Sequence, residues 1–398
     1  MSLAVLKKIS AQILRQETPV LRRMLYDHID FNSKLIGIKG ARGAGKSTML
    51  RQYVKSCKLS PTEILFVSCD HPAMVQGDLY EIAEEFYNHG GKLFIIDEIH
   101  KAPDFSRSLK AIYDLFDLKV IFSGSSALRI EHGKADLSRR AVIHHLGVLS
   151  LSEFISLQTG QQFPTFSLKE IIADHYDIAV EITGKIRPLE QMSYYLEYGC
   201  YPFYLESLID YPHKLAEVVS LTIDTDLCSI FNIAPAKLDK LKKILYMLCA
   251  TPPYEINISK LSSAVGVSWL TLAKYLERMD AGSLVHIIRG GSGMRAVNKP
   301  DKLLLDNPNL FNILCASPDI GSLRESFFVS AIIENRSHQI HYHDQGDFYI
   351  DEKYIFEIGG KSKDGKQLAG LSNGYIAADG LEIGDGRRIP LWLFGFLK

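Results

Sequence analysis

Gly40-Ala41-Arg42-Gly43-Ala44-Gly45-Lys46-Ser47 follows a short apolar run, 35–38, and precedes a segment with a helical pattern. The spacing G-x-x-x-x-G-K-S is typical of a phosphate-binding loop, because its glycines let backbone N–H groups approach phosphate oxygens and its lysine adds a positive charge. The dipole of the following helix also favours an anion at its N-terminus. We therefore expect this loop, together with Thr48, to hold a nucleoside triphosphate, with Ser47 as a Mg²⁺ ligand. The alternative is a glycine-rich turn that matches by chance, which the flanking strand and helix disfavour.

A second apolar run, 93–96, ends in Asp97 and Glu98. This is the pattern of a buried parallel strand that delivers carboxylates at its C-terminal end. We expect Asp97 to bind the Mg²⁺ water shell and Glu98 to orient the attacking water, because in-line phosphoryl transfer needs a positioned nucleophile. The alternative is a strand that ends in a solvated helix cap, and the phosphate-binding loop upstream favours the functional interpretation.

Small hydroxyl residues follow the next expected strand, 118–122, in the stretch Ser123-Gly124-Ser125-Ser126. A hydroxyl at the end of a strand beside the acidic one can hydrogen-bond the γ-phosphate or the attacking water, and Ser125 is our candidate for this sensor. The same stretch also suits an ordinary turn and a helix N-cap. The order of the motifs favours the sensor.

The composition is that of an ordinary globular protein of two or three domains, with 398 residues, 46% apolar residues and a formal net charge of −1. The charge balance provides no general attraction for nucleic acids or anionic membranes. No apolar run is long enough to span a membrane and no export signal is recognisable, so we expect a cytoplasmic location. The cysteines show neither C-x-x-C nor zinc-site spacing, and we expect all of them to be reduced. They are Cys57, Cys69, Cys200, Cys228, Cys249 and Cys315.

The pattern of apolar residues predicts an α/β fold with a P-loop-type parallel sheet. After a helical lead-in, short apolar strands alternate with helical segments through a P-loop nucleotide-binding core at 1–151. The strands are expected at 35–38, 64–68, 93–96, 118–122 and 142–146. A helical period then indicates a helical lid at 152–254. Two further domains follow, at 255–300 and 301–398.

These motifs resemble those of prokaryotic AAA+-type P-loop ATPases that carry a poorly characterised C-terminal domain. The resemblance rests on the phosphate-binding loop, on Ile96-Asp97-Glu98-Ile99-His100 and on the serines after the next strand, and it extends to 149–154. It implies ATP as the nucleotide, Mg²⁺ as the cofactor and ATP hydrolysis as the activity. The resemblance continues beyond the core and covers most of the chain, although in Tyr198-Gly199-Cys200-Tyr201-Pro202 the residue Cys200 departs from the Gly-Gly-Tyr-Pro-like turn of that family.

The resemblance also implies an arginine near the nucleotide or the domain junction. In Leu137-Ser138-Arg139-Arg140 this is Arg139 or Arg140. Such an arginine could neutralise γ-phosphate charge during transfer, either in cis or from a neighbouring subunit. The alternative is a surface arginine that pairs with a carboxylate. The oligomeric state is left open by the sequence.

Residues 255–300 show the order helix, turn, helix and hairpin, which predicts a winged helix. A basic face could engage double-stranded DNA through groove and backbone contacts. Its candidate residues are Thr271, Lys274 and Arg278 on the second helix and Arg289 and Arg295 on the wing, with Met294–Asn298 as the second strand of the hairpin. The alternative is a module that packs internally or contacts a protein.

Residues 301–398 resemble the core of the PD-(D/E)XK metal-dependent nucleases found in the same ATPase family. Asp347 and Glu357 lie on two expected strands where their carboxylates could converge on Mg²⁺. The lysine of this pattern falls on Gly359, and Lys361 lies one pleat further along. A degenerate nuclease fold that serves in binding or packing is therefore favoured, and nuclease activity is not expected.

The sequence leaves two functions open. In the first, the protein is an ATPase whose hydrolysis cycle couples nucleotide state to DNA or protein partners, with Glu98 positioning the water. In the second, it is a slowly hydrolysing, nucleotide-regulated switch whose C-terminal domain recognises a protein, with no role on DNA. The intact acidic pair at 97–98 favours hydrolysis.

Overall fold

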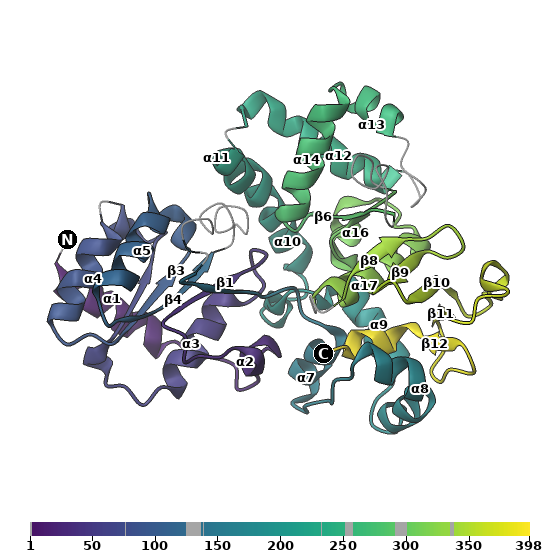
Figure 1. The fold of residues 1–398 in the computed structure, drawn as a ribbon, viewed down its shortest axis with the longest axis horizontal. Coiled ribbons are helices and arrows are strands. Elements are labelled where there is room, and N and C mark those ends of the chain that lie inside the picture. The colour runs from purple at the N-terminus through teal and green to yellow at the C-terminus, as the bar shows by residue number, and fades with distance from the viewer. Residues whose placement is uncertain are drawn as a thin grey trace. The chain divides into compact units, whose positions relative to one another are not determined.

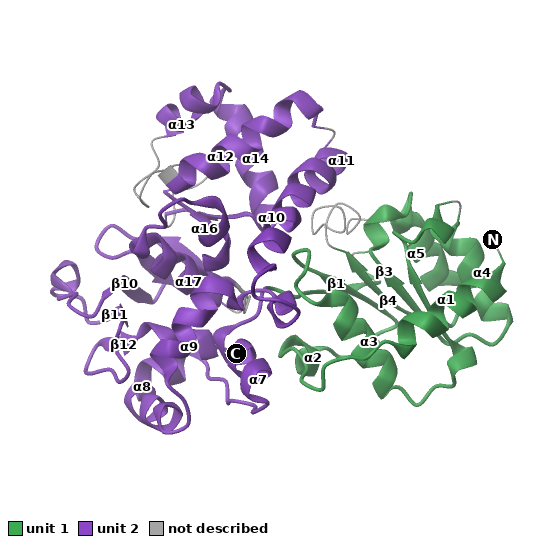
Figure 2. Ribbon diagram, turned by 180° about the vertical axis from the view of Figure 1, so that it is seen from behind, with its two compact units in different colours: residues 1–147 green, residues 148–398 purple. Residues whose placement is uncertain are grey.

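The computed structural model describes residues 2–75, 77–124, 137, 139–231, 233–250, 258–290, 301–334 and 338–398. The chain divides into two compact units, residues 1–147 and residues 148–398 (Figure 2). The finer division into four domains stays a prediction. Among the residues just given, no helix is both long and apolar enough to cross a membrane.

The first unit is built on a sheet of five parallel strands in the order β2-β3-β4-β1-β5, which confirms the predicted fold class. The strands are β1 Leu35–Lys39, β2 Ile64–Ser68, β3 Leu93–Asp97, β4 Lys119–Gly124 and β5 Val142–His145. Ile38 of β1 is in register with Ser123 of β4, which in turn neighbours β3. Because all the strands are parallel, the residues that follow β1, β3 and β4 meet at one edge of the sheet.

Helices cover both faces of this sheet (Figure 1). They are α1 Leu3–Arg15, α2 Leu25–His28, α3 Lys46–Ser56, α4 Leu79–Asn88 and α5 Phe105–Leu115. On β3, Phe94 and Ile96 pack into the core with α1, α4 and α5, whereas Leu93 and Ile95 pack into the core with α3. Burial on both faces explains why β3 is a continuous apolar run rather than an alternating one.

The second unit begins with helices and continues into a mixed domain. Its helices are α7 Leu151–Thr159, α8 Leu168–Thr183, α9 Pro188–Tyr194, α10 Tyr211–Leu221, α11 Cys228–Phe231, α12 Leu238–Ala250, α13 Ile258–Val265, α14 Trp269–Ala281, α16 Pro308–Leu314 and α17 Ile320–Glu334. Capping boxes start two of them: Ser150 with Glu153 begins α7, and Ser167 with Glu170 begins α8. Each box pairs backbone N–H groups that the first helical turn leaves without partners.

A second five-stranded sheet, in the order β12-β11-β10-β9-β8, lies near the C-terminus. Its strands are β8 Ile340–Tyr342, β9 Phe348–Ile350, β10 Tyr354–Gly360, β11 Gly374–Asp379 and β12 Arg388–Pro390. β10, β11 and β12 are parallel, and β8 and β9 are antiparallel to their neighbours. Helix α17 packs on this sheet through Phe328, whose ring centroid lies 5.7 Å from that of Phe348 and 5.2 Å from that of Phe356.

The predicted winged helix is described only in part. Helix α14 packs against α13 and against β6 Val285–Ile288. β6 pairs antiparallel with β7 Lys302–Leu305, so this hairpin crosses the domain boundary predicted at residue 300. The expected wing strand Met294–Asn298 and Arg295 lie outside the described residues.

The predicted DNA-binding residues have protein partners in the structure. The Arg278 guanidinium lies over the Phe231 ring, 4.6 Å from its centroid. Arg289 is 3.9 Å from a carboxylate oxygen of Glu277, and Thr271 hydrogen-bonds the hydroxyl of the helix cap Ser268. Two of the four basic residues on which the expectation of DNA contact was based, Arg278 and Arg289, thus have partners within the chain.

The expectation that all six cysteines are reduced is wrong for one pair. Cys249, in the last turn of α12, forms a disulfide with Cys315, the C-cap of α16, and the two Cα atoms are 5.0 Å apart. Their sequence separation of 66 residues matches no recognisable spacing, and the packing of α12 against α16 brings them together. The other four cysteines are not disulfide-bonded.

Reduction of this disulfide should destabilise the second unit. A cross-link that closes a loop of this length removes denatured-state entropy worth about 4 kcal/mol. In urea titrations followed by tryptophan fluorescence, we expect dithiothreitol, or the replacement Cys315→Ser, to shift the unfolding midpoint of the second unit to lower urea. Cys228→Ser is the matched control and should leave the midpoint sensitive to reductant. Equal midpoints in oxidised and reduced protein would contradict the pairing.

Candidate functional site

The predicted phosphate-binding loop connects β1 to α3. Gly43 and Gly45 have φ values of 82° and 98°, in the left-handed region that favours glycine. A Cβ atom on Gly40 would lie 2.0 Å from the carbonyl oxygen of Leu146. Backbone conformation at two positions and a close backbone approach at the third therefore require the glycines of this stretch.

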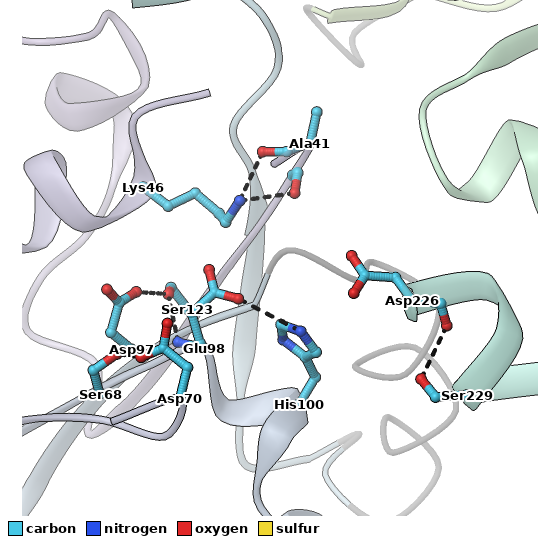
Figure 3. A network of polar contacts seen from close by, with 11 residues as sticks. Ala41, Lys46, Ser68, Asp70, Asp97, Glu98, His100, Ser123, Asp226 and Ser229 are labelled. Atoms are coloured by element: carbon cyan, nitrogen blue, oxygen red, sulfur yellow. Dashed lines mark hydrogen bonds and ion pairs between the residues drawn. The ribbon is translucent and has the colours of Figure 1, made fainter. Parts of the chain in front are cut away.

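Lys46 is nearly fully buried in the first turn of α3, with 4% of its surface exposed. Its Nζ donates hydrogen bonds to the carbonyl oxygens of Gly40, at 3.0 Å, and Ala41, at 2.7 Å (Figure 3). The ammonium group is thus held inside the loop by carbonyl oxygens. Phosphate oxygens are stronger acceptors for the same donor.

Asp97 ends β3 and is also buried. The hydroxyl of Ser123, on the neighbouring strand β4, donates a hydrogen bond to the Asp97 carboxylate (Figure 3). The Ser47 hydroxyl bonds to the same carboxylate. Burial raises the pKa of Asp97, and these two hydrogen bonds act in the opposite direction. A hydroxyl and a carboxylate side by side suit Mg²⁺, which takes few protein ligands when phosphates supply the others.

Glu98 follows at the end of β3 with a left-handed backbone, φ 53°. Its N–H donates to the Ser123 hydroxyl at 3.3 Å, so Ser123 contacts both acidic residues. Its carboxylate Oε2 lies 3.5 Å from Nε2 of His100, a histidine with only 4% of its side chain exposed (Figure 3). The two acids thus point to different partners: Asp97 to hydroxyls and Glu98 to an imidazole.

The sequence analysis selected Ser125 rather than Ser123 from the serine stretch and gave His100 no role. The predicted sensor Ser125 lies outside the described residues, whereas Ser123 is within reach of Asp97 and Glu98. The register of β4 beside β3 selects Ser123, and a single sequence does not provide this register. His100 belongs to a short turn, Ile99–Lys101, whose side-chain directions follow from the conformation of Glu98.

The arginines predicted near the nucleotide lie elsewhere in the first unit. Arg140 forms a two-pronged ion pair with Asp114, with N–O distances of 2.8 Å and 2.9 Å. Arg140 precedes β5, whose residue Val142 is in register with Ile36 near the start of β1. This is the edge at which the strands begin, opposite the phosphate-binding loop, so the geometry does not support Arg139 or Arg140 in cis.

Arg23 connects the loop to the end of the first unit. Its guanidinium donates to the carbonyl oxygen of Ala44 at 2.6 Å and to that of Gly147 at 3.0 Å. Gly147 is the last residue of the first unit. The backbone of the phosphate-binding loop is therefore fastened, through one side chain, to the segment that leads into the second unit.

Of the two acids that the nuclease resemblance implied would converge, Glu357 lies on β10 and Asp347 directly precedes its antiparallel neighbour β9. The Asp347 carboxylate accepts a hydrogen bond from the N–H of Ile358, the residue after Glu357, but the two acids pair with different lysines. Asp347 pairs with Lys302, with a distance of 3.0 Å between Oδ1 and Nζ, and Lys302 also pairs with Glu325 at 2.8 Å. Glu357 pairs instead with Lys363 at 2.9 Å. A turn after β10, closed by the bond from the Lys363 N–H to the Gly360 carbonyl, brings Lys363 rather than the expected Lys361 to this carboxylate. Within the described part of the chain, no three His, Cys, Asp or Glu residues form a group able to hold a metal ion.

Three known proteins or families are similar to the chain. Residues 32–155 match the model of the AAA domain family. The chain is 23% identical to "Uncharacterized protein MJ1637" of Methanocaldococcus jannaschii over 413 residues, which cover 96% of this chain and 87% of the relative. It also resembles the Walker-type ATPase PABY2304 of Pyrococcus abyssi, with 11% identity, a TM-score of 0.43, and coverage of 76% of this chain and 99% of the other.

The parallel sheet and the loop that follows its strand β1 define a P-loop nucleotide-binding domain. The family match makes the class more specific. The matched segment, residues 32–155, contains the phosphate-binding loop and the acidic end of β3, and it is similar to AAA domains. The second unit, from residue 148 onward, lies almost entirely outside the matched segment.

Gly40→Ala should weaken nucleotide binding. The added methyl group overlaps the Leu146 carbonyl oxygen, so the loop backbone must move away from the geometry that surrounds phosphates. We expect at least a tenfold weaker affinity, measured by fluorescence titration with a labelled ATP analogue. Gly184→Ala is the matched control, because a Cβ there meets its nearest atoms at 3.5 Å. Tight binding by the Gly40 variant would contradict the proposed close approach.

Glu325 should make the second unit less stable as the pH rises. Burial raises its pKa from 4.5 to about 7, with Lys302 opposing the shift. Between these values the folded protein keeps a proton that the unfolded chain releases, so the free energy of unfolding falls by up to about 3 kcal/mol from pH 4.5 to pH 7. Urea titrations should show this loss in the parent and not in Glu325→Gln, with the exposed Glu382→Gln as the control. Parallel pH profiles for the parent and Glu325→Gln would overturn the assignment.

Proposed function

We propose that this protein is a Mg²⁺-dependent ATPase that binds ATP at 40–48 and uses Glu98 to position the attacking water. The observation that carries the proposal is the meeting of three polar elements at one edge of the sheet: the phosphate-binding loop, the Asp97 carboxylate and the Glu98 carboxylate. Phosphoryl transfer depends mainly on positioning and on electrostatic stabilisation, and these groups supply both.

Each residue has a distinct role in this proposal. The Lys46 ammonium exchanges its carbonyl partners for β- and γ-phosphate oxygens. Ser47 and Asp97 would hold Mg²⁺, whose charge would neutralise the phosphates. Glu98 orients the water, and Ser123 keeps the two acids in a fixed relation. Ser125 remains a predicted sensor, and Arg139 remains a candidate only from a neighbouring subunit.

The Arg23 contacts support a coupling of nucleotide state to the second unit. Entry of phosphates into the loop acts on the backbone around Ala44, whose carbonyl shares the Arg23 guanidinium with Gly147. A shift of this backbone therefore reaches the segment that leads into the helical part of the chain. We propose that ATP binding and hydrolysis alter the second unit by this route.

The partner of the second unit is proposed to be a protein or DNA, and one observation favours a protein. The expected DNA-contacting residues Arg278 and Arg289 already interact with Phe231 and Glu277. Phosphate release from ATP, measured with and without double-stranded and single-stranded DNA, distinguishes a DNA partner from a protein partner. Stimulation by DNA supports a DNA-coupled ATPase, whereas turnover indifferent to DNA supports a protein-directed switch.

Glu98→Gln should bind ATP normally and hydrolyse it far more slowly. The amide keeps the size of the side chain but cannot accept a proton from the water, a contribution worth about 10²–10⁴ in rate. Steady-state phosphate release measures turnover, and a labelled ATP analogue measures affinity. Lys46→Ala provides the blank. If Glu98→Gln and the parent turn over equally above this blank, the role given to Glu98 is wrong.

A further inference from the structure

We infer that His100 is a positioning residue that orients the Glu98 carboxylate for hydrolysis. This inference rests on the proposed function and adds a residue to it. The carrying observation is the contact between His100 Nε2 and Glu98 Oε2, at 3.5 Å, made by a histidine that is almost fully buried (Figure 3).

The backbone around His100 is firmly held. His100 lies in a 3-10 turn, Ile99–Lys101, that follows β3 directly. The N–H of Lys101 donates to the Glu98 carbonyl and that of Ala102 to the Ile99 carbonyl, both at 2.9 Å. The Ile99 side chain is fully buried in the core of the first unit. The imidazole therefore projects from a rigid support two residues after the carboxylate that it contacts.

Glu98 needs such a support because its backbone alone does not fix its carboxylate. The left-handed conformation at φ 53° is held by the Ser123 hydroxyl on its N–H and by Lys101 on its carbonyl. Beyond Cα the side chain retains several rotatable bonds, and 16% of it is exposed. A buried imidazole within reach of one carboxylate oxygen restricts these rotations, and a Nε2–H group can donate in either the neutral or the charged form of the ring.

Orientation of Glu98 bears on rate rather than on affinity. The distance of 3.5 Å is long for a hydrogen bond, and catalytic contacts of this kind often tighten only when the substrate is bound. A misplaced group in an active site can cost about a hundredfold in rate. His100 itself transfers no proton in this scheme: its effect on turnover passes through Glu98, which distinguishes it from a catalytic residue.

The first test compares turnover and affinity in His100→Ala and His100→Gln. We expect His100→Ala to lower kcat about 10- to 100-fold with KM for ATP and the affinity for a labelled ATP analogue within about twofold of the parent. His100→Gln retains an N–H donor on a side chain of similar reach and should recover much of kcat. The exposed His89→Ala is the matched control and should behave like the parent. Loss of ATP affinity in step with kcat, or no recovery by glutamine, overturns the positioning role.

The second test asks whether His100 acts through Glu98. In the Glu98→Gln background, His100→Ala should change the residual turnover by no more than about twofold, because residues that work as a unit are not additive. A further drop equal to that of the single His100→Ala variant overturns the inference. Thermal melting of each variant identifies misfolding, and the glutamine variant keeps the test valid if the alanine variant is unstable.

Failure of this inference differs from failure of the proposed function. If the parent releases no phosphate above the Lys46→Ala blank, the proposed ATPase activity itself fails. If the parent is active and Glu98→Gln is inactive, but His100→Ala matches the parent, only the role of His100 fails.

Discussion

The hydrogen bond from the Ser123 hydroxyl to the Asp97 carboxylate joins two neighbouring strands at the edge of the sheet where the site forms. A carboxylate as buried as that of Asp97 is costly unless polar groups surround it. Ser123 and Ser47 provide such groups from β4 and from α3. The Ser123 hydroxyl also accepts a hydrogen bond from the Glu98 N–H, so this one hydroxyl contacts both acidic residues. Without these hydrogen bonds, the carboxylate at the end of β3 would lie near the phosphate-binding loop, but its orientation relative to the loop would not be set.

Burying charge is also costly in the second unit, where ion pairs rather than hydroxyl groups compensate it. Lys302 is 5% exposed and lies between the carboxylates of Glu325 and Asp347. The Lys302 ammonium thus forms an ion pair with each of the two carboxylates. Such a buried cluster specifies how β7, α17 and the start of β9 meet, because separating its members leaves uncompensated charge.

Much of the first unit could be predicted because its signals are local. Short apolar runs in the sequence predict the five strands. The glycine spacing predicts the phosphate-binding loop, because the loop needs positive φ values at two glycines and a close approach of the third to the Leu146 carbonyl. The second unit was less accessible, because its partnerships cross long distances in sequence. The disulfide between Cys249 and Cys315 and the ion pair between Lys302 and Asp347 leave no periodic pattern in the chain.

The sequence by itself determined the class of the first unit, the position of the loop and the presence of Asp97 and Glu98 at a strand end, since each depends on neighbouring residues in the chain. Only the tertiary structure decided which groups surround these acids, that Arg140 lies at the far edge of the sheet and that Cys249 meets Cys315. The physical reason is the range of the interactions. Backbone conformation and apolar periodicity act over a few residues, whereas hydrogen bonds, ion pairs and disulfides select partners by their positions in space.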